Sequence, residues 1–409
     1  MPATPCRAGS PVSFLEFSCF RPLALSCEVR HNSSEGSMRS RYSVAIVGAG
    51  VAGAATAYAL TRRGVCDIVL LEREKIAGVH STGRNAAILR TLIPDPELRR
   101  VARESARFYR KPPKGFCSHS LLDPVGIFLL ARPEYSKELL ACLGNGCEES
   151  APRVTDPAQF YRRLPLLAPS ITTVLYQADE GVLDVNAIVQ SFLKGACDRG
   201  AELRTACDAV DLLTSRQEIV GLETSTGRIE SPTVVLAGGG WAADLAARAD
   251  YSLPLVPYRR HLLITEPDTR VDRRWPIVWI LGDEFYFRPE SGGLLMCGCD
   301  TVAVSTDQGE TVDPGEVERI AAKAAHWLPA MATVRVARAW AGMRTFAPDG
   351  RFVIGADPRL RGLHWVAALG GHGITCAPVV GEIAAQWITD GKADHPSANA
   401  LAPGRLVGS

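Results

Sequence analysis

The sequence predicts a protein of the α/β class with a discontinuous main domain and a second, β-rich domain. Three observations support this. An apolar run at 44–47 leads into a glycine-rich turn and an Ala/Leu-rich segment. The order of apolar run, glycine turn and helix recurs at 234–249 and at 352–388. Between 251 and 336, short apolar runs broken by Pro and Gly predict strands instead.

Length and composition favour two domains that act on small molecules. The chain has 409 residues, 46% of them hydrophobic, which is more than one ordinary domain needs. Its 45 basic and 44 acidic side chains give no basic surface of the kind that binds nucleic acid. No apolar run approaches the roughly 20 residues of a transmembrane helix. The 12 cysteines lack metal-ligand spacing, so we expect no metal site, free thiols and a cytoplasmic location.

Residues 1–37 differ from the rest of the chain, since they mix prolines with a Ser/Asn/Gly cluster and show no periodicity. We expect a disordered extension or a misannotated start, with translation beginning at Met38. A targeting peptide is the alternative, but Glu16 interrupts the apolar stretch and the start carries little positive charge.

The segment 44–72 has the pattern of a βαβ unit. A strand is predicted at 44–47, a helix at 54–63 and a second strand at 68–71. The turn between the first two carries a GxGxxG pattern. This pattern in this context predicts a dinucleotide site of the Rossmann type, for which FAD and NAD both remain candidates. A glycine turn that binds nothing is the plain alternative.

Each glycine of that pattern has a physical role. Gly48 makes the tight turn, Gly50 lets the backbone approach a pyrophosphate, and Gly53 allows the helix to pack closely on the strand. The helix N-terminus then faces the phosphates. Glu72 ends the second strand, where its carboxylate can accept hydrogen bonds from a ribose diol.

Further elements follow the same alternation. We expect a helix at 186–199, strands at 201–210, 219–224 and 234–237, and a helix at 242–249 after Gly238-Gly239-Gly240-Trp241. The β-rich insert contains apolar runs at 262–264, 277–281, 285–287 and 294–296. Strands at 352–355 and 364–369 precede a glycine loop at 370–374, which opens a helix at 379–388. A helix start of this kind stabilises the negative charge of a reduced flavin, which favours FAD.

With these motifs in order, the chain from 42 to 392 resembles the FAD-dependent oxidoreductases grouped with D-amino-acid oxidase, glycine oxidase and sarcosine oxidase. The matching segments are the glycine turn, 71–74, 81–87, 179–184, 236–241 and 370–373. The resemblance implies a Rossmann-like FAD-binding domain formed by 38–110, 155–250 and 337–392. It implies a substrate domain on an antiparallel sheet formed by 111–154 and 251–336, and a tail at 393–409.

The resemblance also implies which residues contact FAD. They are Gly48, Gly50, Ala52, Gly53, Glu72, Arg73, Ser81, Thr82, Gly83, Arg84, Asn85, Ala86, Ala87, Ile88, Ala209, Val210, Ala237, Gly238, Trp241, Gly370, Gly371, His372, Gly373, Ile374 and Thr375. Sarcosine oxidases attach flavin through a cysteine near the position of Gly342, and glycine stands there in this chain. We therefore expect non-covalent FAD.

Within that family the segments 80–87, 114–117, 258–260, 284–286 and 340–344 most resemble bacterial D-arginine dehydrogenases, which act broadly on D-amino acids. The resemblance implies that Arg260 and Arg344 bind the substrate carboxylate and that Tyr286 adds a hydroxyl, since a guanidinium fork is a bidentate partner for a carboxylate. Arg259 is an alternative to Arg260, and a structural ion pair is the alternative for Arg344. His372 is a candidate for tuning the flavin or contacting substrate, with a backbone hydrogen bond as its alternative.

The predicted side-chain pocket differs from that of the D-arginine enzymes. Ile88, Ile93 and Ile127 occupy positions that recognise a basic side chain there, so arginine is not expected as substrate. The predicted lining, which favours an apolar or small side chain, consists of Ile88, Ile93, Ile127, Ile277, Trp279 and Gly371. Arg90 would accept an acidic side chain if it points inward; a solvated or phosphate-facing arginine is the alternative.

The predicted reaction is hydride transfer from the Cα of an amino acid to flavin N5, with D-amino acids as the favoured substrates. The resulting imine hydrolyses to a 2-oxo acid and ammonia. The alternatives are a glycine or sarcosine oxidase, a 2-hydroxy-acid dehydrogenase, and a catalytically idle flavin-carrying subunit. The sequence leaves open the electron acceptor (a quinone, a dye-like carrier or oxygen) and the oligomeric state.

Overall fold

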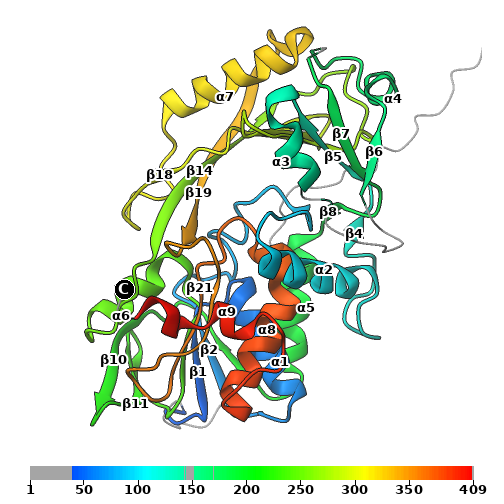
Figure 1. The fold of residues 1–409 in the computed structure, drawn as a ribbon. Coiled ribbons are helices and arrows are strands. Elements are labelled where there is room, and N and C mark those ends of the chain that lie inside the picture. The colour runs from blue at the N-terminus through cyan, green and yellow to red at the C-terminus, as the bar shows by residue number, and fades with distance from the viewer. Residues whose placement is uncertain (1–38, 142, 144–151, 169, 408–409) are drawn as a thin grey trace, which may run out of the picture. The chain divides into compact units, whose positions relative to one another are not determined.

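The computed structural model describes residues 39–141, 143, 152–168 and 170–407. The predictions for residues 1–37 lie outside this range. From Arg39 onward the chain forms one compact unit, which contains two large sheets with helices packed on them (Figure 1). In the described part of the chain, no helix is both long and apolar enough to cross a membrane.

The first large sheet has six strands and carries the predicted βαβ unit. Its order is β20 (Val353–Ala356), β21 (Leu363–Ala367), β13 (Val234–Leu236), β1 (Val44–Val47), β2 (Ile68–Leu71) and β9 (Glu202–Arg204). All neighbours are parallel except β20 and β21. The carboxyl ends of β1, β2, β13 and β21 therefore meet at one edge, where open α/β sheets bind their ligands.

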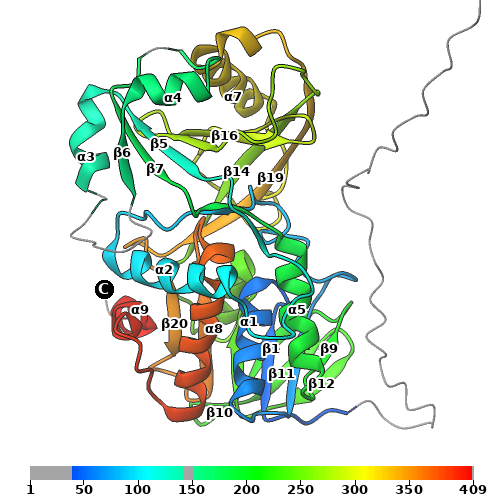
Figure 2. The same cartoon turned by 90° about the vertical axis from the view of Figure 1, so that its right-hand side faces the viewer.

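Helices and a small sheet cover the two faces of this six-stranded sheet. Figure 2 shows α1 (Val51–Arg62), α5 (Val185–Cys197) and α8 (Gly373–Asp390) side by side over one face, where α2 (Pro96–Arg110) joins their core. A second core on the other face includes residues of α6 and of a three-stranded sheet. Those elements are α6 (Ala242–Ala247), β10 (Ala209–Ser215), β11 (Glu218–Thr224) and β12 (Gly227–Glu230).

The second large sheet has nine strands. Its path is β18 (Val302–Ala303), β14 (Val256–Thr265), β17 (Gly293–Cys297), β16 (Phe285–Glu290), β15 (Ile277–Ile280), β5 (Ile127–Ala131), β7 (Thr173–Gln177) and β6 (Arg153–Thr155), with β19 (Val336–Phe346) paired to β14. Every pair is antiparallel except β15 with β5. One face packs with α4 (Pro157–Arg163) and α7 (Pro314–Trp327), while the other carries a separate core around Leu262, Trp279 and Tyr286.

Short elements complete the structure. A three-stranded sheet has the order β3 (Ile88–Leu89), β8 (Gly181–Leu183) and β4 (Leu122–Asp123). Among the described residues, the remaining helices are α3 (Ser136–Ala141), α9 (Ala398–Leu401) and four 3-10 turns, η1 (Pro133–Tyr135), η2 (Gly239–Trp241), η3 (Pro329–Met331) and η4 (Pro403–Leu406).

Two predictions about elements need correction. The helix expected at 379–388 begins at Gly373 instead. The prediction placed its start after Pro378, but this proline lies inside α8. Proline has no N–H and leaves the carbonyl of Ile374 without its helical donor. The Tyr109 hydroxyl of α2 donates to that carbonyl and satisfies it. The strand expected at 201–210 is divided into β9 and β10, which belong to different sheets.

Two strands join a different sheet from the one expected. β7 and most of β19 lie in segments assigned to the FAD-binding domain, yet both pair within the nine-stranded sheet. An apolar strand pattern predicts burial, but it does not say which sheet the strand joins. β19 therefore runs from the β-rich part of the chain to the cofactor edge of the six-stranded sheet.

Candidate cofactor and substrate site

The glycine turn after β1 has the close contacts that its sequence predicts. Gly48 has a φ of +99°, and a Cβ there would lie 2.7 Å from the carbonyl oxygen of Ala237. A Cβ on Gly53 would lie only 2.0 Å from the carbonyl oxygen of Gly48. The backbones of β1, β13 and α1 can approach this closely only because these positions lack side chains. The turn thus allows the backbones of β1, β13 and α1 to pack closely against one another.

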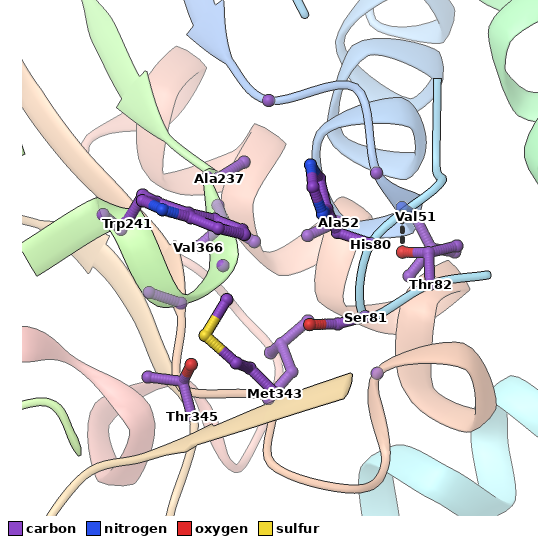
Figure 3. Close-up of a pocket in the computed structure, with 18 of the residues that line it drawn as sticks. Val51, Ala52, His80, Ser81, Thr82, Ala237, Trp241, Met343, Thr345 and Val366 are labelled. Atoms are coloured by element: carbon purple, nitrogen blue, oxygen red, sulfur yellow. Dashed lines mark hydrogen bonds between the residues drawn. The ribbon is translucent and has the colours of Figure 1, made fainter. Parts of the chain in front are cut away.

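The residues around this turn orient polar groups toward the same space. Glu72, at the end of β2, is buried and accepts hydrogen bonds from the backbone N–H of Ala49 at 3.1 Å and of Glu74 at 3.0 Å. The hydroxyl of Thr82 accepts from Val51 N at 3.1 Å at the start of α1, as the dashed line in Figure 3 shows. The N-cap residue of α1, a glycine, supplies no side-chain hydrogen bond. A phosphate would suit this helix start.

A pocket of about 1280 Å³, part of it open to solvent, lies at the carboxyl ends of these strands. Figure 3 shows Trp241, His80, Met343 and Thr82 around it. Most of the predicted cofactor residues line it. They are Gly48, Gly50, Ala52, Glu72, Arg73, Ser81, Thr82, Asn85, Ala209, Ala237, Gly238, Trp241, Gly370, Gly371, Gly373 and Ile374.

Other predicted cofactor residues do not line this pocket. They are Gly53, Gly83, Arg84, Ala86, Ala87, Ile88, Val210, His372 and Thr375. Gly53 acts through helix packing, as its contact with Gly48 shows. Val210 is 39% exposed, since side chains alternate along β10 and its neighbour Ala209 takes the inward position. Ile88 instead packs in the core below the nine-stranded sheet.

Several residues that line the pocket were not among the predicted cofactor contacts. The segment 366–369 lines the pocket directly before the predicted glycine loop, so the end of β21 was an available signal. His80, Met343 and Thr345 also line it. Met343 and Thr345 come from β19, most of which was assigned to the FAD-binding domain, but neither residue was among the predicted cofactor contacts.

A cluster of charged and aromatic side chains lies beside the pocket around Trp241. The guanidinium of Arg73 lies 3.8 Å from the Trp241 ring centre, and the His80 ring lies 4.7 Å from it. His80 Nδ1 lies 2.9 Å from Glu310 Oε1, and His80 Nε2 lies 3.0 Å from Glu74 Oε1. Burial opposes protonation, but the hydrogen bonds and charges of these two carboxylates raise the pKa of His80 above its ordinary value.

Arg260 and Arg344 lie on one face of the β14–β19 pair. In the register of these strands, Arg260 is opposite Gly342 and Arg344 is opposite Tyr258, so alternation places both arginines on the same face. Arg259 points to the other face, where its guanidinium pairs with Asp313 at 3.4 Å. A Cβ at 342 would lie 2.9 Å from Arg84 Cβ and 3.4 Å from Arg344 Nη1. Glycine at 342 thus leaves room for the guanidinium.

Neither arginine of this face has a carboxylate partner among the described residues. Arg344 is 7% exposed and donates to the backbone carbonyls of Met343 at 2.9 Å and Arg84 at 2.7 Å. Arg260 Nε is buried and has no hydrogen-bond partner in the described part of the chain. Burial, with a further contribution from the charge of Arg260, lowers the pKa of Arg344. The ion-pair alternative for Arg344 therefore finds no partner among these residues.

Aromatic side chains continue this face. Trp279 and Tyr286 are opposite each other in β15 and β16, and their rings stack at 4.4 Å with an angle of 24°. Tyr286 is buried, which raises the pKa of its hydroxyl well above its ordinary value. The guanidinium of Arg90 lies 4.2 Å from the Trp279 ring centre. Arg90 therefore points toward this site, as expected if its side chain is directed inward rather than into solvent or toward a phosphate.

His372 precedes the first residue of α8 and is close to two of these arginines. Burial, together with the positive charges of Arg90 and Arg260, lowers the pKa of His372 to about 3. The imidazole is therefore neutral at physiological pH. Its backbone N–H donates to Leu369 O.

The predicted apolar wall is only partly assembled as expected. Ile127 and Ile277 are paired in register between β5 and β15 and are fully buried in the same core as Ile88 and Trp279. Ile93 packs instead in the core of the six-stranded sheet with α1 and α8. Its apolar character fits either core, and the pocket role of Ile93 stays a prediction.

The family follows from the comparisons with known proteins. A family model described as FAD dependent oxidoreductase matches residues 43–387, which is most of the chain. The protein belongs to this family, whose members bind FAD.

Individual relatives cover this chain to different extents. Human mitochondrial dimethylglycine dehydrogenase is 25% identical over 386 residues, covering 88% of this chain and 44% of that protein. Glycine oxidase of Pseudomonas putida is 26% identical over 348 residues, covering 82% and 91%. The chain thus spans less than half the length of the first relatives it matches. In fold it matches L-proline dehydrogenase from P. horikoshii with a TM-score of 0.81 at 24% identity, covering 90% and 98%.

The pocket fits FAD by its own chemistry. Gly48 and Gly50 line the pocket without side chains, and the start of α1 offers backbone N–H groups to a pyrophosphate. The Glu72 carboxylate stands where a ribose diol would be bound. The start of α8 also lines the pocket and would stabilise negative charge on a flavin ring. Non-covalent attachment stays a prediction.

Proposed function

We propose that the protein oxidises amino acids by transferring a hydride from the substrate Cα to FAD, as an amino-acid dehydrogenase or oxidase. The observation that carries this proposal is the pair formed by Arg260 and Arg344 on one sheet face. A buried guanidinium without a counterion is costly, so such a pair favours binding of an anion. A carboxylate matches the fork of a guanidinium with two parallel hydrogen bonds.

The same geometry explains how a substrate would be held. The carboxylate would lie at Arg260 and Arg344, with the Tyr286 hydroxyl beside it. Arg344 itself lines the pocket together with Met343 and Thr345, so the proposed carboxylate site would adjoin the cofactor. Fixing the carboxylate in this way places Cα next to the flavin and lowers the entropic cost of the reaction.

The residues of the site also limit the acid–base chemistry. With a pKa of about 3, His372 is too weak a base to remove a proton from a substrate ammonium group near neutral pH. We therefore propose that the substrate reacts as the neutral amine, selected from solution. When bound, FAD supplies the hydride acceptor. The imine product would then hydrolyse to a 2-oxo acid and ammonia.

The proposal includes a substrate preference. D-amino acids are the first candidates, by the resemblance to D-arginine dehydrogenases, which itself stays a prediction. Arginine is not expected, because Ile88 and Ile127 are apolar and buried. Glycine and N-methyl amino acids are the second candidates, and the names of the glycine oxidase and dimethylglycine dehydrogenase relatives favour them. All of these candidate substrates carry an amine where a 2-hydroxy acid carries a hydroxyl, so a site that accepts an amine would distinguish them from 2-hydroxy acids.

The test is substrate reduction of the FAD-loaded protein without oxygen, followed by assays with oxygen and with a dye as acceptor. The panel contains D- and L-amino acids, glycine, sarcosine and 2-hydroxy acids. Replacing Arg344 or Arg260 with Met should weaken substrate binding about 10- to 100-fold, the effect of losing a hydrogen bond to a charged group. Arg259→Met serves as the matched control, since Arg259 faces the opposite side of β14.

Three results would contradict the proposal. Reduction by 2-hydroxy acids alone would show that the site does not select an amine. FAD that no member of the panel reduces would favour a flavin-carrying subunit without catalytic activity. Equal losses in Arg259→Met and Arg344→Met would mean that the arginine effect is structural.

A further inference from the structure

We propose that residues 304–311, between β18 and α7, form a clasp that retains FAD in its pocket and opens to let the cofactor enter and leave. Glu310 and Thr306 are the side chains that hold the clasp closed. Exchange of the cofactor does not depend on which substrate the protein oxidises, so the clasp is independent of the carboxylate site.

The clasp lies against three parts of the pocket wall that are distant from one another in the sequence. These are the segment 80–84, the turn η2 with the start of α6, and β19. Each of them contributes residues that line the pocket, among them His80, Trp241 and Met343, which Figure 3 shows. A segment that touches all three parts holds one side of the pocket together.

Glu310 makes the central contact of the clasp. Its Oε1 lies 2.9 Å from His80 Nδ1, and its Oε2 lies 3.1 Å from Arg84 Nη2. One carboxylate thus bridges the two ends of the segment 80–84. Arg84 Nη1 also donates to the carbonyl of Ala341 at 3.3 Å, so the same guanidinium joins the clasp to β19.

Two further contacts hold the clasp on its other side. Thr306 Oγ1 donates to Asp244 Oδ2 at 2.8 Å, which joins the clasp to α6. Gly309 is buried and packs so closely on Met343 that a Cβ there would overlap with the Met343 side chain. Met343 lines the pocket, whereas the described residues 304–311 do not. The clasp therefore supports this part of the wall from outside.

The construction of the clasp allows it to open without disturbing a core. Of its eight described residues only Gly309 is buried, and the segment consists of turns and irregular backbone. Its ends are fixed, because β18 pairs with β14 before it and α7 starts at Pro314 after it. A segment with few buried contacts opens at a lower free energy than a core element does. Loop motions of this kind control the entry and release of ligands in many enzymes.

The test measures the exchange of FAD by the full chain. Binding is followed after FAD is mixed with the FAD-free protein, and release after dilution of the loaded protein, both through flavin fluorescence. Glu310→Gln keeps the size of the side chain but removes its charge. We expect release to become about 5- to 12-fold faster, between the effects of an exposed ion pair and of a hydrogen bond to a charged group. Because a clasp that opens more often also admits FAD more often, binding should become faster too.

Two other variants address the rest of the segment. Thr306→Val removes the hydroxyl that donates to Asp244, and it should accelerate release about 2- to 5-fold, as for one exposed hydrogen bond. Combined with Glu310→Gln, it should give the product of the two effects, since both contacts hold the same closed state. Asp307→Asn is the matched control. It removes a charge from the same segment at an exposed residue outside these contacts and should exchange FAD like the wild type.

Two measurements separate a clasp from a general structural role. The Tm of FAD-free Glu310→Gln should fall by at most about 2 °C, because partly exposed ion pairs contribute little to stability. Amide hydrogen exchange within residues 304–311 should become faster in Glu310→Gln and stay at the wild-type rate in Asp307→Asn. A large loss of Tm together with faster exchange throughout the protein would overturn the proposal, since Glu310 would then support the fold as a whole.

The rates themselves give the remaining outcomes. Faster release without faster binding would mean that Glu310 stabilises bound FAD and does not control its entry, which refutes the clasp. Equal acceleration in Asp307→Asn would show that the negative charge of the segment acts on FAD from a distance. If Glu310→Gln changes neither rate, its contacts do not hold the pocket closed. Should Glu310→Gln fail to fold, Thr306→Val tests the same closed state through its own two rates.

Discussion

Replacing Gly53 with Ala tests whether the glycine turn is set by the close approach of α1 to β1. The added methyl carbon would lie 2.0 Å from the carbonyl oxygen of Gly48 and 3.2 Å from Ile46 Cγ2. Cβ atoms essentially never approach another heavy atom more closely than 3.0 Å, so α1 must move by about 1 Å, the difference between 3.0 and 2.0 Å. Because α1 packs against α5 and α8, the neighbouring helices oppose this shift.

The magnitude follows from that displacement. Overpacking of a core costs typically about 1–3 kcal/mol, and the rigid surroundings of α1 place this change toward the upper end. Each kcal/mol lowers Tm by about 2–4 °C in domains of about 150–250 residues and by less in a longer chain. The start of α1 also moves relative to Glu72, so FAD affinity should fall at least about tenfold, which corresponds to about 1.4 kcal/mol.

Both quantities can be measured on the same preparations. Thermal unfolding of the FAD-free protein gives the loss of stability, and titration of FAD followed by its fluorescence gives the Kd. Gly404→Ala is the matched control, because the nearest heavy atom to a Cβ there is 4.0 Å away. If Gly53→Ala has the Tm and Kd of this control, the close contact does not constrain the turn and the reasoning is refuted.

Two further predictions concern a buried hydrogen bond and a titrating side chain. Tyr109→Phe leaves the carbonyl of Ile374 without a donor, so the free energy of unfolding in urea should fall by about 1–3 kcal/mol. For His80, the raised pKa means that its ion pairs stabilise the folded state fully below about pH 6.5 and lose this effect as the pH rises through the higher folded-state pKa. The Tm difference between the wild type and His80→Asn should therefore be largest in acid and shrink above about pH 6.5.

Each of these predictions has a defined control. Tyr58→Phe removes a hydroxyl that has no hydrogen-bond partner among the described residues and should change stability less than Tyr109→Phe; equal losses would contradict the role given to the hydroxyl of Tyr109. For His80, a Tm difference that stays constant across the pH range would show that its charge does not contribute. Glu310→Gln should reduce the pH dependence in the wild-type background, because Glu310 is one of its two carboxylate partners.

The cofactor half of the site was predictable because its signals are local. The glycine turn, the strand at 44–47 and the acid at Glu72 lie within one short βαβ unit, where residue type and spacing constrain backbone geometry directly. The glycine loop at 370–374 was equally visible. The start of α8 was placed too late, because Pro378 resembles a helix boundary unless the hydroxyl of Tyr109 is known to be nearby.

The remaining features depend on contacts between distant segments. Glu310 approaches His80 across 230 residues of sequence, and no pattern in either segment predicts this. The choice between Arg259 and Arg260 likewise depends on the pairing register of β14 with β19, since a shift of one residue exchanges the two faces. The direction of Arg90 became clear only when Trp279 was placed beside it.

The lining of the cofactor pocket begins at Val47 and ends at Ile374, which has a consequence for synthesis of the protein in the cell. The ribosome completes the glycine turn before it reaches the segments around Ile374 that close the pocket. FAD can therefore be enclosed only after the chain as far as Ile374 has left the ribosome. We expect the newly synthesised protein to pass through a cofactor-free stage before β19 and α8 enclose FAD. The supply of FAD would then determine how long the cofactor-free chain is exposed to proteases.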